Sequence, residues 1–266
     1  IRKSLVGSEM CIRDRIYLYE KSLFLKKLQK QNIDNKRIKW IKNFNSIKKG
    51  PVIFFGNEFF DAIPIKQFSN INNELFEKCY SVKDNINIIE KFIRSNKKDF
   101  AQIMTFGSLK KLKFIEFPKK GLSELNPIIK KINKLSGGIL LIDYGYLNSN
   151  NSNTIQAVMN NKKISTETML KNLGKADITS LVNFNLLKEY FLKNNLKVKN
   201  VVTQRFFLER MGIIKRAQIL EKKRTYEEQK YMKEPLSRLL EEKQMGSLFK
   251  VIFGYKNKNN NFFGFE

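Results

Sequence analysis

The sequence predicts an α/β domain built around a parallel β-sheet, and three observations support this prediction. Short apolar runs alternate with a helical stretch in the N-terminal part of the chain, which is the spacing of strand–helix–strand units. The runs at 52–56 and 139–142 are continuously apolar, as expected of strands buried on both faces. Acidic residues follow strands at Glu20, Glu58 and Asp143. Ligands bind at this end of the strands in open α/β sheets, so we expect the functional site there.

The expected elements follow one another along the chain. The strands, including one hairpin, are expected at 16–19, 37–41, 52–56, 65–69, 75–81 and 138–143. Ser22 is the expected N-cap of a helix that ends near Gln31. The polar turn 70–73 predicts that the hairpin is antiparallel. Further helices are expected at 122–135, 179–194, 204–221 and 226–244. Residues 197–203 and 248–255 are expected to form an antiparallel pair that closes the sheet.

The composition excludes several kinds of chemistry. The 266 residues include no histidine, which excludes a histidine-based triad, a histidine-ligated zinc site and imidazole base catalysis. Cys11 and Cys79 lie far apart and give neither a disulfide framework nor a metal spacing, so we expect a reducing compartment and no metal. No apolar run approaches the length of a membrane span. Catalysis is therefore left to carboxylates, tyrosines, lysines or a cofactor.

The strong positive charge raises the question of nucleic-acid binding. The chain has 51 lysines and arginines against 25 acidic residues. However, the lysines are spread along the chain, and no RNA-binding aromatic signature lies among them. Lysine, asparagine and isoleucine are abundant throughout, as expected from a genome rich in A and T. We therefore interpret the charge as a property of composition, and we do not expect a specific nucleic-acid partner.

The two ends of the chain differ from the part between them. Residues 1–15 have no hydrophobic period and lack the features of a signal or transit peptide. SLVGSEMCIRDR resembles a translated sequencing-adapter remnant, so 1–15 is expected to be a non-native leader. The predicted domain covers 16–255, with an insertion at 84–135 and a C-terminal part at 146–255 that completes the sheet. Residues 256–266 are expected to be a polar tail.

The stretch FFGNEFFDAIPIKQF, residues 54–68, has the greatest concentration of chemistry-bearing side chains. It places Asn57, Glu58 and Asp61 just beyond a buried strand, while Phe59 and Phe60 are expected to pack the loop against the sheet. Acidic residues at strand ends are commonly solvated turn formers, and this remains the alternative for each of them. An acid at the end of the second strand is the expected ribose ligand, because its carboxylate can accept both sugar hydroxyls.

Several segments occur in an order that is typical of one protein family. The segment GNEFFDAIPIKQF is similar to the family's N-E-F-F-D-A-L-P stretch, and GGILLIDYG is similar to its G-G-x-x-L-I-I-D-Y-G stretch. The other segments in the series are YLYEKSLFLKKLQ, IEFP, TIQAV, KADIT, TQRFFLERMGIIKRAQIL and QMGSLFKVIF. From Ile16 to about Tyr255 the chain resembles the MidA-like family of S-adenosylmethionine-dependent methyltransferases. This family includes a mitochondrial complex I assembly factor that acts as a protein arginine methyltransferase.

The resemblance implies a fold, an activity and a cofactor. The implied fold is a Rossmann-like methyltransferase sheet with helical insertions, and the implied cofactor is S-adenosyl-L-methionine. The implied reaction is methyl transfer to an arginine guanidinium of a protein substrate, in support of the assembly of respiratory complex I. A carboxylate can hold the planar guanidinium in a bidentate fork and take the proton that is lost on methylation. Glu58 is the leading candidate for this role and Asp61 the next, and both are assigned as catalytic.

The resemblance also assigns the remaining site residues. Glu20 and Asn57 are expected to bind the cofactor, and Asp143 and Tyr144 to bind the substrate. A buried tyrosine with a satisfied hydroxyl is an equal alternative for Tyr144. No metal is expected. The implied location is the bacterial cytoplasm, or the mitochondrial matrix if the source is eukaryotic.

The chain departs from the family pattern at three places. The glycine-rich loop that precedes YLYE in the family is absent, Tyr146 replaces a histidine, and Asn183 replaces an aspartate. The sheet is therefore expected to lack its first strand, and the chain is expected to be an inactive fragment that binds S-adenosylmethionine poorly.

Two other functions compete with methyl transfer. One is a non-catalytic, methyltransferase-like assembly chaperone that binds a partner protein. The other is a nucleic-acid methyltransferase, which ranks last because Asn57-Glu58-Phe59-Phe60 lacks the prolines of an N/D-P-P-Y tetrapeptide. Glu116 in IEFP has a local alternative of its own, as a hydrogen-bonding anchor.

Overall fold

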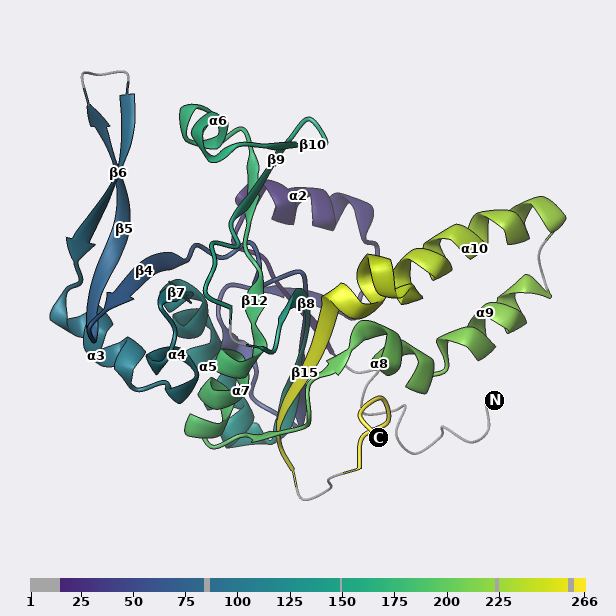
Figure 1. Cartoon of the computed structure of the whole chain (residues 1–266). Coiled ribbons are helices and arrows are strands. Elements are labelled where there is room, and N and C mark those ends of the chain that lie inside the picture. The colour runs from purple at the N-terminus through teal and green to yellow at the C-terminus, as the bar shows by residue number, and fades with distance from the viewer. Residues whose placement is uncertain (1–14, 84–86, 149, 223–224, 258–260) are drawn as a thin grey trace. The chain divides into compact units, whose positions relative to one another are not determined.

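A computed structural model describes residues 15–83, 87–148, 150–222, 225–257 and 261–266 (Figure 1). The chain divides into two compact units, Ile1–Gly50 and Pro51–Glu266, and each is described by itself. None of the helices among the described residues is long and apolar enough to cross a membrane.

The N-terminal unit contains one βαβ motif. Strand β1 (Ile16–Tyr19) is followed by helix α2 (Leu23–Asn32) and strand β2 (Ile38–Ile41), and a 3-10 turn η1 (Phe44–Ser46) comes after them. The two strands pair in parallel. The Ser22 hydroxyl caps the helix by accepting the Leu25 N–H at 3.2 Å. The predicted parallel unit and its cap are therefore confirmed.

Side-chain hydrogen bonds fasten helix α2 to both strands of this motif. The indole Nε1 of Trp40 on β2 donates to Gln29 Oε1 at 2.9 Å. Gln29 Nε2 in turn donates to the Glu20 carboxylate, just past the end of β1, at 3.3 Å. Gln29 thus links the helix to the carboxyl-terminal ends of both strands.

The main sheet of the C-terminal unit contains six strands in the order β12-β8-β15-β13, with β3 on β8 and β14 on β15. Their bounds are Val52–Asn57 for β3, Gly137–Tyr146 for β8, Val182–Asn183 for β12, Lys197–Val198 for β13, Val202–Thr203 for β14 and Phe249–Lys256 for β15. β3 and β12 run parallel to β8. β15 runs antiparallel to β8, β13 and β14. The predicted parallel pair and the antiparallel closing strands are both confirmed.

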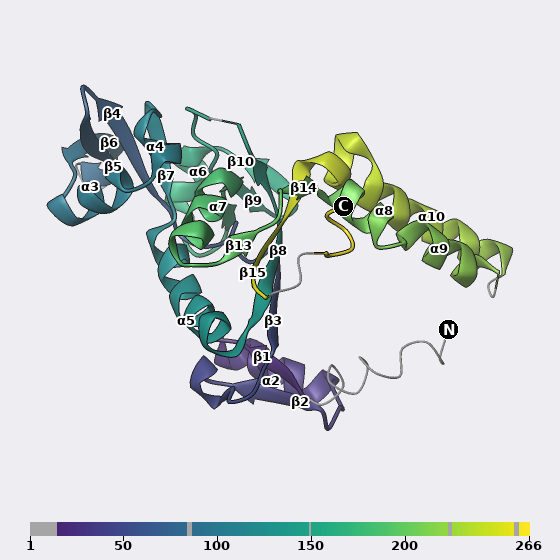
Figure 2. The same ribbon diagram turned by 90° about the horizontal axis from the view of Figure 1, so that it is seen from below.

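Helices cover the two faces of this sheet. Figure 2 shows α5 (Lys119–Leu135) and α7 (Phe184–Lys193) on one side of β8 and β15, and α8 (Gln204–Arg210) on the other. On the α8 side, a core forms from Ile142, Phe207, Phe249 and Val251. This burial of apolar area stabilises the strand that carries the site.

On the face of the main sheet that α8 covers, apolar side chains of β3 remain exposed. Leu140 packs against the α8 core, and Phe55 is its register partner on β3. The expectation that the strand at 52–56 is buried on both faces is wrong, because the Ile53 and Phe55 side chains are 72% and 66% exposed. Among the described residues, β3 pairs with β8 alone, so it forms an apolar edge of this sheet.

An inserted antiparallel sheet has the strand order β6-β5-β4-β7 (Figure 1). Its strands are β4 (Lys66–Ile71), β5 (Glu74–Lys83), β6 (Asn87–Arg94) and β7 (Phe114–Phe117), and the short helices α3 (Lys97–Met104) and α4 (Gly107–Lys110) lie between β6 and β7. The predicted hairpin is confirmed as β4–β5. Asn72 and Asn73 both have positive φ, 49° and 64°, which the tight turn between right-twisted strands requires.

A small three-stranded sheet follows β8, with the order β10-β9-β11. It consists of β9 (Gln156–Met159), β10 (Lys162–Ile164) and β11 (Asp177–Thr179), with helix α6 (Thr166–Lys171) between β10 and β11. Residues 156–179 are called the arm below. Figure 1 shows the arm next to the end of β8 that carries β12.

Three predicted helices differ from the structure. The helix expected at 179–194 begins at Phe184, because β11 and β12 use the preceding residues as strands. The helix expected at 204–221 is broken into α8 and α9 (Ile213–Glu221) by Gly212, which adopts a left-handed φ of 82°. The helix expected at 226–244 ends at Leu240 as α10 (Tyr226–Leu240), and a separate π turn η2 (Glu242–Gly246) follows.

Candidate functional site

The loop after β3 begins with a tight backbone turn. A Cβ atom at Gly56 would lie 2.9 Å from Leu141 Cδ2 and 3.3 Å from Phe59 Cβ, so a larger residue does not fit without a shift. Glu58 then adopts φ 49°, in the left-handed region that costs a non-glycine residue about 1 kcal/mol or more. Its N–H still donates to Ile142 O at 2.9 Å. The neighbouring strand therefore holds Glu58 in a strained conformation.

Glu58 and Asn57 present their side chains to solvent. Both residues are exposed, and the Asn57 amide donates to Glu58 Oε1 at 3.3 Å. The amide fixes the direction of one carboxylate oxygen while leaving the group accessible. The predicted catalytic glutamate is thus available to a ligand at the carboxyl end of β3.

Asp143 lies beneath this loop and anchors it. Its Oδ2 accepts the N–H groups of Phe60 at 2.8 Å and Asp61 at 3.3 Å, and its Oδ1 accepts the Tyr144 N–H at 3.0 Å. Asp143 is only 2% exposed. Burial raises its pKa to about 7, and the Asp61 charge adds to the increase, although the three backbone donors oppose it. The structure therefore places Asp143 where it positions the loop.

Asp61 is buried and has an oxygen without a partner. The residue is 6% exposed, and within the described part of the chain nothing bonds to its Oδ1. Burial raises the pKa of Asp61, and the negative charges of Glu58 and Asp177 raise it further. A buried polar atom without a partner costs about 1–3 kcal/mol, so a donor supplied by a ligand would recover this energy.

Tyr144 connects the end of β8 to the arm. Its hydroxyl is hydrogen-bonded to Thr179 Oγ1, and its ring packs against Phe249 with 5.7 Å between ring centroids. Burial raises the pKa of the Tyr144 hydroxyl, and the charges of Asp61, Asp143 and Asp177 contribute. The charges of three carboxylates therefore act on the Tyr144 hydroxyl.

Glu20 belongs to the N-terminal unit. Its Oε1 accepts the Ser22 N–H at 2.8 Å, and its Oε2 accepts Gln29 Nε2 at 3.3 Å. Each oxygen keeps a lone pair after these bonds. The carboxylate is thus held in place with acceptor capacity for two hydroxyl groups, which fits the ribose of a nucleoside cofactor.

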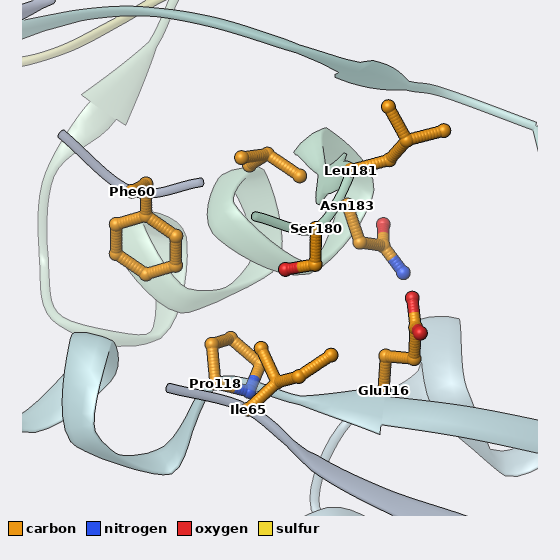
Figure 3. Close-up of a pocket in the computed structure, with 8 residues that line it drawn as sticks. Phe60, Ile65, Glu116, Pro118, Ser180, Leu181 and Asn183 are labelled. Carbon is orange, nitrogen blue, oxygen red and sulfur yellow. The ribbon is translucent and has the colours of Figure 1, made fainter. Parts of the chain in front are cut away.

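Glu116 has a structural role, as its local alternative predicted. It is buried, and its Oε1 accepts Gln67 Nε2 at 2.8 Å and the Thr154 N–H at 2.9 Å. Figure 3 shows Glu116 beside a cavity that Phe60, Ser180 and Asn183 also line. The cavity holds about 20 Å³, which is room for roughly one water molecule and not for a nucleoside.

Asp177, Thr179 and Ser180 were not assigned a role from the sequence. Thr179 bonds to Tyr144, and the Ser180 N–H donates to Asp61 O at 3.1 Å. The signal for Asp177 and Thr179 was the position of KADIT in the family order, which carries no information on contacts, and Ser180 lies outside that motif. Within the described part of the chain no group of three or more histidines, cysteines, aspartates or glutamates is arranged to hold a metal ion.

Residues 5–202, more than half of the chain, match the model of a protein family described as "Putative S-adenosyl-L-methionine-dependent methyltransferase". The chain belongs to this family. The predicted recognition and the predicted cofactor class are thereby confirmed.

Curated relatives carry the names of protein arginine methyltransferases. The chain is 31% identical over 187 residues to "Protein arginine methyltransferase NDUFAF7 homolog, mitochondrial" of Caenorhabditis elegans, a match over 66% of this chain and 41% of the relative. It is 25% identical over 183 residues to "Protein arginine methyltransferase NDUFAF7, mitochondrial" of Danio rerio, over 69% of this chain and 42% of the relative. The match thus spans about two fifths of the length of these two relatives.

Two solved structures from Burkholderia thailandensis share the fold of this methyltransferase family member. An uncharacterized protein is similar with a TM-score of 0.79 and 18% identity, over 95% of this chain and 69% of that chain. A second protein, bound to S-adenosyl-homocysteine, is similar with a TM-score of 0.76 and 17% identity, over 95% of this chain and 66% of that chain. The predicted Rossmann-like methyltransferase fold is confirmed by these similarities.

Proposed function

We propose that the protein transfers a methyl group from S-adenosylmethionine to the guanidinium group of an arginine in a protein substrate. The observation that carries this proposal is the arrangement of Glu58 and Asp61, an exposed carboxylate on a strained turn beside a buried carboxylate whose Oδ1 has no partner in the described chain. A flat cation with several N–H donors supplies what both carboxylates lack.

The chemistry follows from the charges. When bound, the cofactor supplies an electrophilic methyl group. Glu58 accepts hydrogen bonds from the guanidinium and increases the electron density on the nitrogen to be methylated. That nitrogen would form a bond to the methyl carbon while the bond from this carbon to the sulfonium sulfur breaks and its electron pair passes to the sulfur. The nitrogen would lose a proton, and Glu58 or Asp61 would accept it. Holding the nitrogen in line with the bond that breaks supplies much of the acceleration.

The remaining site residues position the loop or bind the substrate and the cofactor. Asp143 holds the backbone of the loop through the Phe60 and Asp61 N–H groups. Tyr144 is proposed to line the part of the site that binds the substrate. Asn57 orients Glu58 and would contact the cofactor. In the N-terminal unit, Glu20 is proposed as a ligand of ribose hydroxyls.

The names of the curated relatives support a protein substrate and a mitochondrial location in a eukaryotic source. A subunit of respiratory complex I is the proposed substrate, and a bacterial protein of this family would act in the cytoplasm.

Incubation with labelled S-adenosylmethionine and the proteome of the source cell tests the proposal. The assay uses the 266-residue chain and a version extended at its N-terminus by a glycine-rich loop of the family. We expect the extended version to label arginine. Glu58→Gln should abolish this label, and Glu234→Gln, an exposed change of the same charge on α10, should retain it. Label on lysine or on nucleic acid would contradict the proposal. Stable binding of a partner protein without any label would favour the assembly-chaperone alternative.

A further inference from the structure

Strand β11 of the arm is fastened to the site at two neighbouring points. Thr179 Oγ1 is hydrogen-bonded to the Tyr144 hydroxyl, and the next residue, Ser180, donates its N–H to Asp61 O at 3.1 Å. These bonds come from residues on β8 and on the loop after β3. The position of β11 relative to both site segments is therefore fixed by hydrogen bonds.

The strand geometry determines the face on which Asp177 lies. Side chains alternate along a strand, so residues two apart share a face. Asp177 and Thr179 are two apart on β11, and Thr179 faces Tyr144. Asp177 therefore faces the side on which Tyr144 and Asp61 lie, and it remains exposed.

The electrostatics agree with this placement. After the effect of burial, the Asp177 charge is among the causes that raise the pKa of both Asp61 and Tyr144. The Glu58 charge also acts on Asp61. The charges of Glu58 and Asp177 thus both act on Asp61, whose Oδ1 is buried and has no partner within the described chain.

A bound cation would offset the negative charges of Glu58, Asp61 and Asp177. Like charges at close range disfavour ionisation, and an opposite charge placed between them favours it. The described carboxylates do not form a metal site. A guanidinium offers five N–H donors in one plane and can bridge several carboxylates at once.

We propose that Asp177 is a substrate-positioning residue, which forms the arm side of a cation-binding site with Glu58 and Asp61 and selects an arginine side chain over a neutral one. This inference rests on the proposed function, because it concerns the substrate of the same site. It adds that the arm takes part in substrate recognition through one carboxylate.

Peptide binding to the 266-residue chain tests the inference without the cofactor. The probes are a short capped peptide with one arginine among glycines and the same peptide with citrulline, which keeps the shape and lacks the charge. We expect the chain to bind the arginine peptide more tightly. We expect Asp177→Asn to weaken that binding roughly three- to tenfold, and Asp177→Glu to retain most of it.

Glu167→Gln is the matched control. Glu167 lies in the arm, is exposed, and pairs with Lys171 at 2.6 Å, so the substitution removes the same charge from the same segment. We expect it to leave peptide affinity unchanged. Circular dichroism establishes that Asp177→Asn is folded.

The inference is overturned if Asp177→Asn and the unmodified chain bind the arginine peptide equally. It is also overturned if Glu167→Gln weakens binding as much, or if the unmodified chain does not prefer arginine to citrulline. Its failure is distinct from failure of the proposed function, which is decided by transfer of label to arginine and not by peptide affinity.

Discussion

The carboxylate of Asp143 accepts the Phe60 N–H at 2.8 Å, although 83 positions separate the two residues in the chain. Asp143 lies on β8, and Phe60 lies in the loop that follows β3. The two strands are already paired in parallel, so this bond extends their pairing into the loop. The conformation of the segment that carries Glu58 and Asp61 thus depends on a side chain of the neighbouring strand.

Replacement of Asp143 by alanine is expected to destabilise the protein. Asp143→Ala leaves the N–H groups of Phe60, Asp61 and Tyr144 without their acceptor, at a cost of about 1–3 kcal/mol for each group that stays buried. Urea unfolding at pH 5 measures the loss of free energy of unfolding. Asp34→Ala, at an exposed position, is the control and should change it little. An equal effect of the two substitutions would contradict the anchoring role.

The raised pKa of Asp143 predicts a pH dependence of stability. The folded state keeps the proton up to a pKa of about 7, whereas the ordinary value is 3.8. The contribution of Asp143 is therefore greatest below pH 3.8 and falls by about 1.4 kcal/mol for each pH unit until about pH 7. The measurement is the difference in free energy of unfolding between the unmodified chain and Asp143→Asn, from pH 4 to 8. Taking the difference removes the effect of the large net charge, and two parallel curves would refute the prediction.

The strained backbone at Glu58 predicts that stability and activity respond differently to substitution. Glu58→Gly relieves the φ of 49° and should raise the free energy of unfolding by about 1 kcal/mol. It should also abolish methylation, as should Glu58→Gln, because both remove the carboxylate. Glu209→Gly, within helix α8, should instead lower stability by about 1 kcal/mol. A loss of stability in Glu58→Gly would show that the left-handed backbone is not strained.

Removal of the Tyr144 hydroxyl is expected to loosen the arm. Tyr144→Phe deletes the hydrogen bond to Thr179 at a cost of about 1 kcal/mol. Hydrogen exchange should become faster at 177–180, where β11 is fastened to the site. Tyr190→Phe is a matched control, because its hydroxyl donates to Leu122 O at 2.8 Å and its loss should affect α5 and α7 instead. Unchanged exchange at 177–180 in Tyr144→Phe would mean that this bond does not hold the arm.

Local sequence signals predicted the elements that depend on local contacts. Ser22 caps α2, and the run 139–142 forms the buried part of β8, because capping and continuous apolar character act within a few residues. The asparagine-containing turn between β4 and β5 was found for the same reason. These features also located Glu58 just beyond β3, whereas the expectation that Asp143 follows its strand is wrong, because β8 continues to Tyr146 through its pairing with β12 and β15.

The errors arose where distant contacts decide the structure. The expected helix begins at residue 179, yet the Ser180 N–H donates to Asp61 O, and the Asn183 side chain caps α7 by accepting the Leu186 N–H at 3.1 Å. Asp177 was not assigned because its importance depends on Thr179 facing Tyr144, across a sequence separation of 35. The pattern of residues along the sequence does not show that Thr179 and Tyr144 lie close together.

The bond between Trp40 and Gln29 has a practical consequence for spectroscopy. Trp40 is the only tryptophan of the sequence, and it lies in the N-terminal unit with its indole N–H bonded to α2. Intrinsic fluorescence excited at the red edge therefore reports on that unit alone, and a change in this signal marks unfolding of the N-terminal unit. Unfolding of the N-terminal unit can thus be followed without a label, separately from a signal such as far-ultraviolet circular dichroism that both units produce.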